Sequence, residues 1–204
     1  MTLVKICGIT SLADARVAID AGADALGFNF YRPSPRYISP ETVREITDQL
    51  PQSILRVGVF VNEDVESVVR IIAEANLSAV QLHGDESPEY CHKLAGQYVI
   101  KVFRAGDDFD SGAYAVDAIM LDTKDDLLRG GTGRVFDWSI AQRTNNSAPK
   151  LFLAGGLSPE NVVDAIVTVR PYAVDACSSL EERPGRKNHA RVRAFVEAAR
   201  SVKP

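Results

Sequence analysis

The chain has 204 residues, of which 46% are hydrophobic, and a formal net charge of −4 at pH 7. This length and ordinary globular composition predict one domain, residues 1–204, with a substantial core. The weak negative charge and the lack of a dense basic cluster argue against a nucleic-acid partner. We also expect no membrane span and no secretory signal, because no apolar run has the required length or flanking pattern.

Three cysteines, Cys7, Cys91 and Cys177, are odd in number and lie far apart in the chain. This spacing argues against a disulfide framework or a zinc cluster and favours a reducing, cytoplasmic location. The three histidines show no spacing typical of metal ligands, so we expect no metal. Cys91 falls on the core side of a predicted helix, near Tyr90 and Leu94, and is expected to be structural.

Short runs of β-branched and apolar residues predict eight strands along the chain. In chain order they cover residues 3–7, 24–28, 56–61, 78–82, 98–103, 118–121, 151–154 and 172–176. The alternation of side chains along the first strand places Lys5 and Cys7 on one face and Val4 and Ile6 on the other. A lysine on an otherwise apolar face indicates that this face has a catalytic or binding role.

Between the strands, helix-start signals precede amphipathic stretches. The predicted starts are Ser11, Ser39-Pro40, Asn62, Ser87-Pro88 and Ser158-Pro159. Further helical segments are expected at residues 108–115, from about 137, and over 192–199. Eight strands, each followed by helix or helix-like sequence, predict a parallel sheet closed into a (β/α)8 barrel, the TIM-barrel fold. A doubly wound open sheet is the alternative, although it rarely needs eight units of such uniform length.

In such barrels the functional residues lie at the carboxyl ends of the strands and in the loops that follow. Polar or glycine-rich positions at these ends are Cys7, Arg36, His83, Asp122, the 127–133 loop with Gly131, Gly155-Gly156, and Asp175 with Ser178. Glycines there let backbone N–H groups approach a phosphate closely. Four of these positions also have a simpler interpretation: a buried thiol for Cys7, a solvated arginine for Arg36, and tight turns at His83 and at Gly155-Gly156.

Several short motifs occur in order along nearly the whole chain. They are KICGIT (5–10), GADALGFNF (22–30), SPRY (34–37), VQLHG (80–84), LD (121–122), GGTG (130–133), LAGGL (153–157) and PGRK (184–187). In these motifs the chain resembles the phosphoribosylanthranilate isomerase family of tryptophan biosynthesis. The resemblance implies an Amadori rearrangement of N-(5′-phosphoribosyl)anthranilate without a metal or an organic cofactor.

The resemblance also implies roles for individual residues. Asp122 would be the general acid that protonates the furanose oxygen, and Cys7 the general base that removes a proton from the sugar. Arg36 would face the anthranilate carboxylate, while the loops with Gly131, Gly156 and Ser178 would hold the phosphate. The remaining substrate-binding candidates at the mouth of the barrel are His83 and Asp175.

The general base needs a cation or a helix terminus to form a thiolate, because a free thiol titrates near pH 8.5. Lys5, on the same strand face as Cys7, is one candidate cation, and Asp175 is a plausible counter-ion for it.

One segment departs from the family pattern, which usually reads Asp-Val-Ser-Ser-Gly-Val-Glu after the eighth strand. Here Cys177 replaces a serine and Ser179 a glycine. Because the first and eighth strands of a closed barrel are neighbours, Cys7 and Cys177 are expected side by side, within reach of a disulfide. The alternative is that Cys177 merely replaces a loop serine.

Two other functions remain open at this point. One is another phosphosugar barrel enzyme, such as indole-3-glycerol-phosphate synthase or a histidine-pathway isomerase, which needs other residues at the strand ends. The second is a barrel that binds a phosphorylated ligand without catalysis, against which the Cys7 and Asp122 pair argues. Either a monomer or a homodimer fits the sequence.

Overall fold

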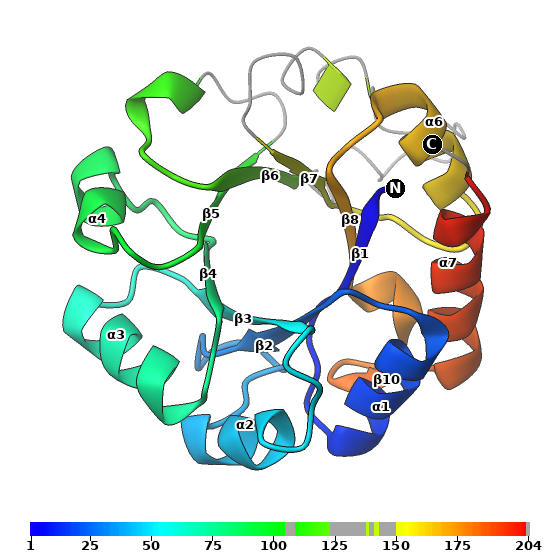
Figure 1. Cartoon of the computed structure of the whole chain (residues 1–204), viewed down its shortest axis with the longest axis horizontal. Helices are drawn as coiled ribbons and strands as arrows, with labels where there is room; N and C mark the ends of the chain where they lie inside the picture. The colour runs from blue at the N-terminus through cyan, green and yellow to red at the C-terminus, as the bar shows by residue number, and fades with distance from the viewer. Residues whose placement is uncertain (105–108, 123–137, 139–140, 143–149, 203–204) are drawn as a thin grey trace.

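The computed structural model describes residues 1–104, 109–122, 138, 141–142 and 150–202. Within these residues eight strands pair side by side in parallel and close into a barrel in chain order (Figure 1). They are β1 (Leu3–Ile6), β2 (Ala25–Asn29), β3 (Leu55–Phe60), β4 (Ala79–Leu82), β5 (Val99–Arg104), β6 (Ala118–Asp122), β7 (Leu151–Leu153) and β8 (Ala173–Ala176). The predicted (β/α)8 barrel is therefore confirmed, and the open-sheet alternative is wrong.

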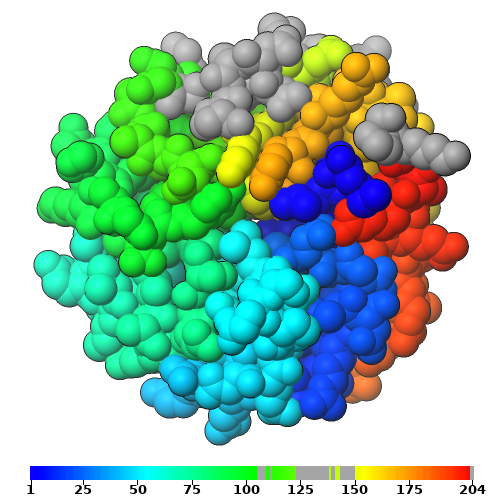
Figure 2. All heavy atoms as spheres, in the orientation of Figure 1, coloured from blue at the N-terminus to red at the C-terminus, as the bar shows by residue number. Residues whose placement is uncertain are grey.

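Helices surround the barrel on its outside (Figure 1). They are α1 (Leu12–Ala21), α2 (Pro40–Thr47), α3 (Val65–Glu74), α4 (Pro88–Lys93), α6 (Val162–Val169) and α7 (His189–Ser201). A short hairpin, β9 (Glu181–Arg183) and β10 (Arg186–Lys187), precedes α7. The blue N-terminal residues lie against the red C-terminal helix in Figure 2, where Arg200 donates a hydrogen bond of 3.1 Å to the carbonyl oxygen of Thr2.

Two apolar layers follow from the alternation of side chains along the strands. Val4 and Ile6 belong to the larger layer, which lies between the strands and the helices. Residues of the opposite face, including Ile100 and Phe152, form a separate cluster inside the barrel. Lys5 also faces inward and is completely buried, so the predicted face assignment of the first strand holds.

Three predicted helix starts are confirmed, because the hydroxyl oxygens of Ser11, Ser39 and Ser87 each accept a hydrogen bond from an N–H of the first turn. The prediction for Asn62 is wrong. Asn62 has a φ of 51°, in the left-handed region, whereas the N-cap of α3 is Asp64, in the extended conformation that capping requires.

Two other helix predictions need correction. α6 begins at Val162 with Asn161 at its N-cap, because the Asn161 side chain accepts the Ser158 N–H at 2.8 Å and closes a turn there instead. Of the segment predicted as helical over 108–115, the described residues 109–115 form only a short 3-10 turn, η1 (Ser111–Ala113). The helix predicted from about residue 137 lies largely outside the described residues. No helix in the described part of the chain is long and apolar enough to cross a membrane.

Candidate active site

A cavity of about 270 Å³ opens at the carboxyl ends of the barrel strands. Its lining includes Cys7, Asn29, Arg36, Gln81, His83, Asp122, Gly155, Gly156, Asp175, Cys177 and Ser178. Seven of the eight site residues predicted from the sequence thus face one space. The eighth, Gly131, lies outside the described residues.

An ion pair lies at the base of this cavity. The Nζ atom of Lys5 is 2.7 Å from Oδ1 of Asp175, and both side chains are buried. Burial opposes the charge on Lys5, but Asp175 and Cys7 together hold the pKa of Lys5 above its usual value. Burial raises the pKa of Asp175 to about 6, against the attraction of Lys5.

Cys7 follows β1, where its backbone N–H donates to the Ala176 oxygen of β8 at 3.0 Å. The pKa of the Cys7 thiol lies well below its usual value, first because of a hydrogen bond with Cys177 and then because of the positive charges of Lys5 and Lys187, while burial opposes the shift. This environment favours a thiolate, which is the form of a cysteine that can take up a proton.

Asp122 ends β6, which β7 and β8 separate from the first strand. Its Oδ2 atom lies 3.3 Å from Nε2 of His83. On the other side of the imidazole, the amide nitrogen of Gln81 is 3.1 Å from Nδ1. An amide nitrogen only donates, so Nδ1 accepts, and a neutral His83 carries its proton on Nε2, facing Asp122. Gln81 thereby orients His83, and His83 orients Asp122.

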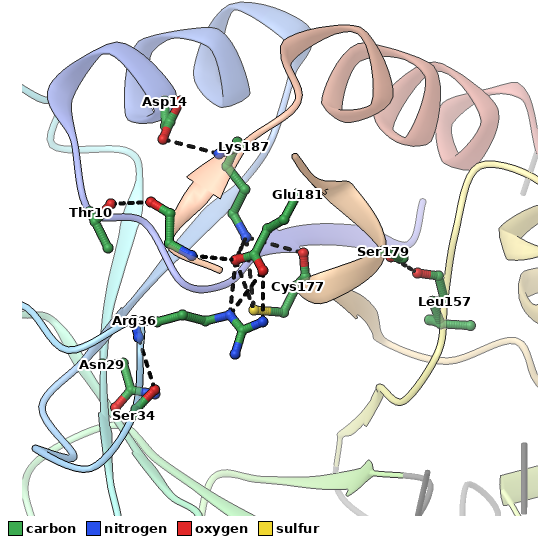
Figure 3. A network of polar contacts seen from close by, with 11 residues as sticks. Thr10, Asp14, Asn29, Ser34, Arg36, Leu157, Cys177, Ser179, Glu181 and Lys187 are labelled. Carbon is green, nitrogen blue, oxygen red and sulfur yellow. Dashed lines mark hydrogen bonds and ion pairs between the residues drawn. The ribbon is translucent and has the colours of Figure 1, made fainter. Parts of the chain in front are cut away.

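Arg36 enters the cavity from the loop after β2. Its guanidinium binds the carboxylate of Glu181 with Nε 2.9 Å from Oε1 and Nη2 2.7 Å from Oε2. Glu181 also accepts from Lys187 at 3.0 Å, so that Arg36, Lys187 and Cys177 converge on it (Figure 3). These hydrogen bonds raise the pKa of Arg36 and hold that of Glu181 below its usual value against the effect of burial.

The loops after β7 and β8 meet on one side of the cavity. Gly155 and Gly156 have φ of 85° and 65°, where residues with a Cβ are strained. The Ser179 hydroxyl donates to the Leu157 carbonyl oxygen and joins the two loops (Figure 3). Ser178 begins the 3-10 turn η3 (Ser178–Leu180). Gly155 and Gly156 thus form a tight turn at the cavity, and their role in phosphate binding stays a prediction.

Sequence reasoning assigned no role to Asn29 and Gln81, which line the cavity, or to Glu181 and Lys187, which pair beside it. Gln81 shares a strand face with His83, two residues further along, so strand alternation could have found it. Glu181 and Lys187 stand in segments that the sequence analysis quotes, but only the β9–β10 hairpin of the structure brings them to the site. Cys91 is buried in α4, as expected.

The barrel fold, with polar side chains gathered at the carboxyl ends of its strands, is typical of a (β/α)8-barrel enzyme. An ionisable thiol, a carboxyl group and an arginine share one cavity, and no group of three or more potential metal ligands occurs among the described residues.

Comparisons with known proteins identify the family. The model of the N-(5′-phosphoribosyl)anthranilate (PRA) isomerase family matches residues 4–198. The isomerase of Thermotoga neapolitana is 48% identical over 206 residues, covering 99% of this chain and 100% of that protein. The chain belongs to the PRA isomerase family.

Solved structures agree with this assignment. A phosphoribosyl anthranilate isomerase in complex with reduced 1-(o-carboxyphenylamino)-1-deoxyribulose 5-phosphate has a TM-score of 0.85 and 41% identity, covering 99% of this chain and 100% of that one. A monomeric form of the dimeric isomerase of Thermotoga maritima has a TM-score of 0.86 and 42% identity, with the same coverage.

Proposed function

We propose that this chain converts N-(5′-phosphoribosyl)anthranilate to 1-(2-carboxyphenylamino)-1-deoxyribulose 5-phosphate, with Cys7 as general base and Asp122 as general acid. The family is one of aldose–ketose isomerases in tryptophan biosynthesis. The observation that carries the residue roles is the single cavity that holds both a thiol beside two lysines and a carboxyl group at a separate strand end.

The reaction begins with opening of the furanose ring. Asp122 gives its proton to the ring oxygen as the bond from that oxygen to C1 breaks, which leaves an iminium between C1 and the anthranilate nitrogen. The Cys7 thiolate then removes the proton from C2, and the electron pair of that bond forms an enaminol. Transfer of a proton to C1 and loss of the hydroxyl proton at C2 give the ketone. Each positioned acid or base typically contributes about 10²–10⁴-fold to the rate.

Arg36 suits the carboxylate of the anthranilate ring, because a planar guanidinium donates to both oxygens of such a group. Gly156 and Ser178 suit the phosphate, since both face the cavity from adjoining loops. Gly131 would contribute from the loop after Asp122. His83 serves by orienting Asp122, and Asp175 by pairing with Lys5 beneath the base.

The experiment that tests this proposal is incubation of the purified protein with N-(5′-phosphoribosyl)anthranilate, with the product identified by NMR. Formation of the aminodeoxyribulose phosphate supports the isomerase. Binding of the substrate without turnover would instead support the non-catalytic alternative. Conversion of a histidine-pathway aminoaldose phosphate alone would support the other phosphosugar enzymes.

We also propose a cytoplasmic location, because Cys7, Cys91 and Cys177 all carry free thiols and a reducing compartment keeps them so. As for assembly, a monomer and a homodimer both fit the fold. Light scattering of the purified chain distinguishes them.

A further inference from the structure

Two thiols lie side by side where the barrel closes. Strands β1 and β8 pair with Ile6 opposite Ala176, so the next residues, Cys7 and Cys177, emerge together at the cavity. The two thiols are near enough that each shifts the pKa of the other, that of Cys7 downward and that of Cys177 upward. The space around them is tight, because a Cβ on Gly8 would lie 2.9 Å from the sulfur of Cys177.

Five charged side chains surround this thiol pair: Lys5 on β1, Arg36 after β2, Asp175 on β8, Glu181 on β9 and Lys187 on β10. Lys5 and Asp175 form a pair whose charges cancel. Arg36 and Lys187 both bind the single carboxylate of Glu181, which leaves one positive charge in excess. One thiolate restores neutrality, whereas two would leave a net negative charge in a largely buried site.

Asp122 is the next charged group across the cavity and acts on Asp175 at a distance. Buried charges are stable only when they are compensated. The cluster therefore favours one thiolate and one thiol in the Cys7–Cys177 pair.

The contacts decide which sulfur keeps the proton. Cys7 is the more buried of the two cysteines and lies beside Lys5. The positive charges of Lys5 and Lys187 both favour its thiolate. The sulfur of Cys177 lies 3.8 Å from Nζ of Lys187 and 3.9 Å from the Glu181 carboxylate. Glu181 pairs with this lysine, and its negative charge opposes a thiolate on Cys177. Its hydrogen bond with Cys7, followed by burial, raises the pKa of Cys177. Cys177 is thus the donor and Cys7 the acceptor.

We propose that Cys177 is a positioning residue for the reaction, whose thiol retains its proton and donates a hydrogen bond to the Cys7 thiolate. This inference rests on the proposed role of Cys7 as the general base. It also gives a function to the departure from the family pattern, since a serine hydroxyl at this position could donate in the same way. Cys177 acts through Cys7 and transfers no proton itself.

The test follows alkylation of each cysteine by iodoacetamide as a function of pH, without substrate, by mass spectrometry of peptides. In the wild-type chain Cys7 is expected to react first, with a midpoint below that of an ordinary thiol. Cys177→Ala is expected to raise this midpoint by about one pH unit, a roughly tenfold loss of reactivity at neutral pH. Cys177→Ser keeps a donor and is expected to restore the low midpoint. Cys91→Ala is the matched control and leaves it unchanged.

A midpoint unaltered in Cys177→Ala, or faster alkylation of Cys177 than of Cys7, would overturn the proposal. If Cys177→Ala does not fold, the wild-type chain still decides: thiolate absorbance must show one thiolate, not two, between pH 7 and about 9. Because alkylation needs no substrate, the result is independent of turnover. A folded chain that shows these midpoints but has no isomerase activity would refute the proposed function. The hydrogen bond from Cys177 to Cys7 would still be supported.

The pH profile of kcat/KM provides a second readout. The profile should rise with the ionisation of Cys7, so Cys177→Ala moves this rise to higher pH and Cys177→Ser moves it back. A purely structural role of Cys177 would lower activity at every pH alike.

Discussion

The carboxylate of Glu181 binds one edge of the Arg36 guanidinium, through Nε at 2.9 Å and Nη2 at 2.7 Å. Within the described part of the chain the remaining nitrogen, Nη1, has no hydrogen-bond partner, and Arg36 lines the cavity. Glu181 therefore holds the arginine in one orientation while part of its donor edge stays available. A preoriented guanidinium loses little conformational freedom when it binds a carboxylate.

The first prediction concerns this arginine. Arg36→Met is expected to raise KM about tenfold to a hundredfold, because hydrogen bonds to a charged group contribute about 1.5–3 kcal/mol, and to change kcat little. Steady-state kinetics with N-(5′-phosphoribosyl)anthranilate measure both. Arg32→Met, in the same loop but outside the cavity lining, is the control. An unchanged KM with a large loss of kcat would contradict a binding role.

A second prediction concerns Lys187, which is buried and pairs with Glu181 at 3.0 Å. Its positive charge helps to hold the pKa of Cys7 below the usual value. Lys187→Met should therefore raise that pKa, so the rise of kcat/KM with pH moves upward and activity falls more at pH 6 than at pH 9. The comparison is Lys93→Met, an exposed lysine of α4.

Loss of one partner of a buried ion pair also destabilises a protein, by about 3–5 kcal/mol. The kinetics of Lys187→Met are therefore measured at a temperature where circular dichroism shows the variant folded. A pH profile of kcat/KM that keeps its wild-type midpoint in Lys187→Met would show that Lys187 does not lower the pKa of Cys7.

The third prediction uses Gly27 of β2, next to the base. A Cβ at this position would lie 2.6 Å from the sulfur of Cys7 and 3.1 Å from Nζ of Lys5. Gly27→Ala should displace the thiol, and a shift of about 1 Å in a reacting group can lower a rate about a hundredfold. Overpacking costs about 1–3 kcal/mol, so the barrel should still fold. The control is Gly112→Ala, at an exposed position outside the cavity lining. Equal turnover in the two variants would show that a Cβ at position 27 does not displace the Cys7 thiol.

A fourth prediction is reversible inactivation by hydrogen peroxide. Peroxide oxidises the Cys7 thiolate to a sulfenic acid, and the Cys177 sulfur then displaces water from it to form a disulfide. The two electrons lost by the thiol pair reduce the peroxide. Dithiothreitol should restore activity, and inorganic phosphate should slow the loss by filling the cavity. Mass spectrometry of the oxidised wild-type chain without reductant should show a peptide that joins Cys7 to Cys177 and that Cys177→Ser lacks. Reversible inactivation of the wild type without this peptide would exclude the disulfide.

Much of the fold could be predicted because hydrophobic periodicity is local. The alternation over residues 3–7 places Lys5 inside the barrel and Ile6 against the helices, as the structure does. The errors at Asn62 and Ser158 have a common cause, since both side chains could cap a helix by type. Their backbone geometry depends on partners, Asp85 and Asn161, that the capping signal does not include.

The site could be predicted only where a residue stands at a strand end. Cys7, His83 and Asp122 follow from the barrel topology together with the motifs. The Arg36–Glu181 contact spans 145 positions of the chain, and no sequence period indicates it. The charge balance around the thiol pair depends on such contacts, so it required the structure.

The central claim is that Cys7 and Asp122 perform acid–base catalysis of one isomerisation. The most direct measurement is turnover of N-(5′-phosphoribosyl)anthranilate by the wild-type chain, Cys7→Ala and Asp122→Asn, each shown to be folded by circular dichroism. The account predicts turnover by the wild type and a loss of at least about a hundredfold in kcat for each variant. Wild-type turnover in either folded variant would contradict the role assigned to that residue.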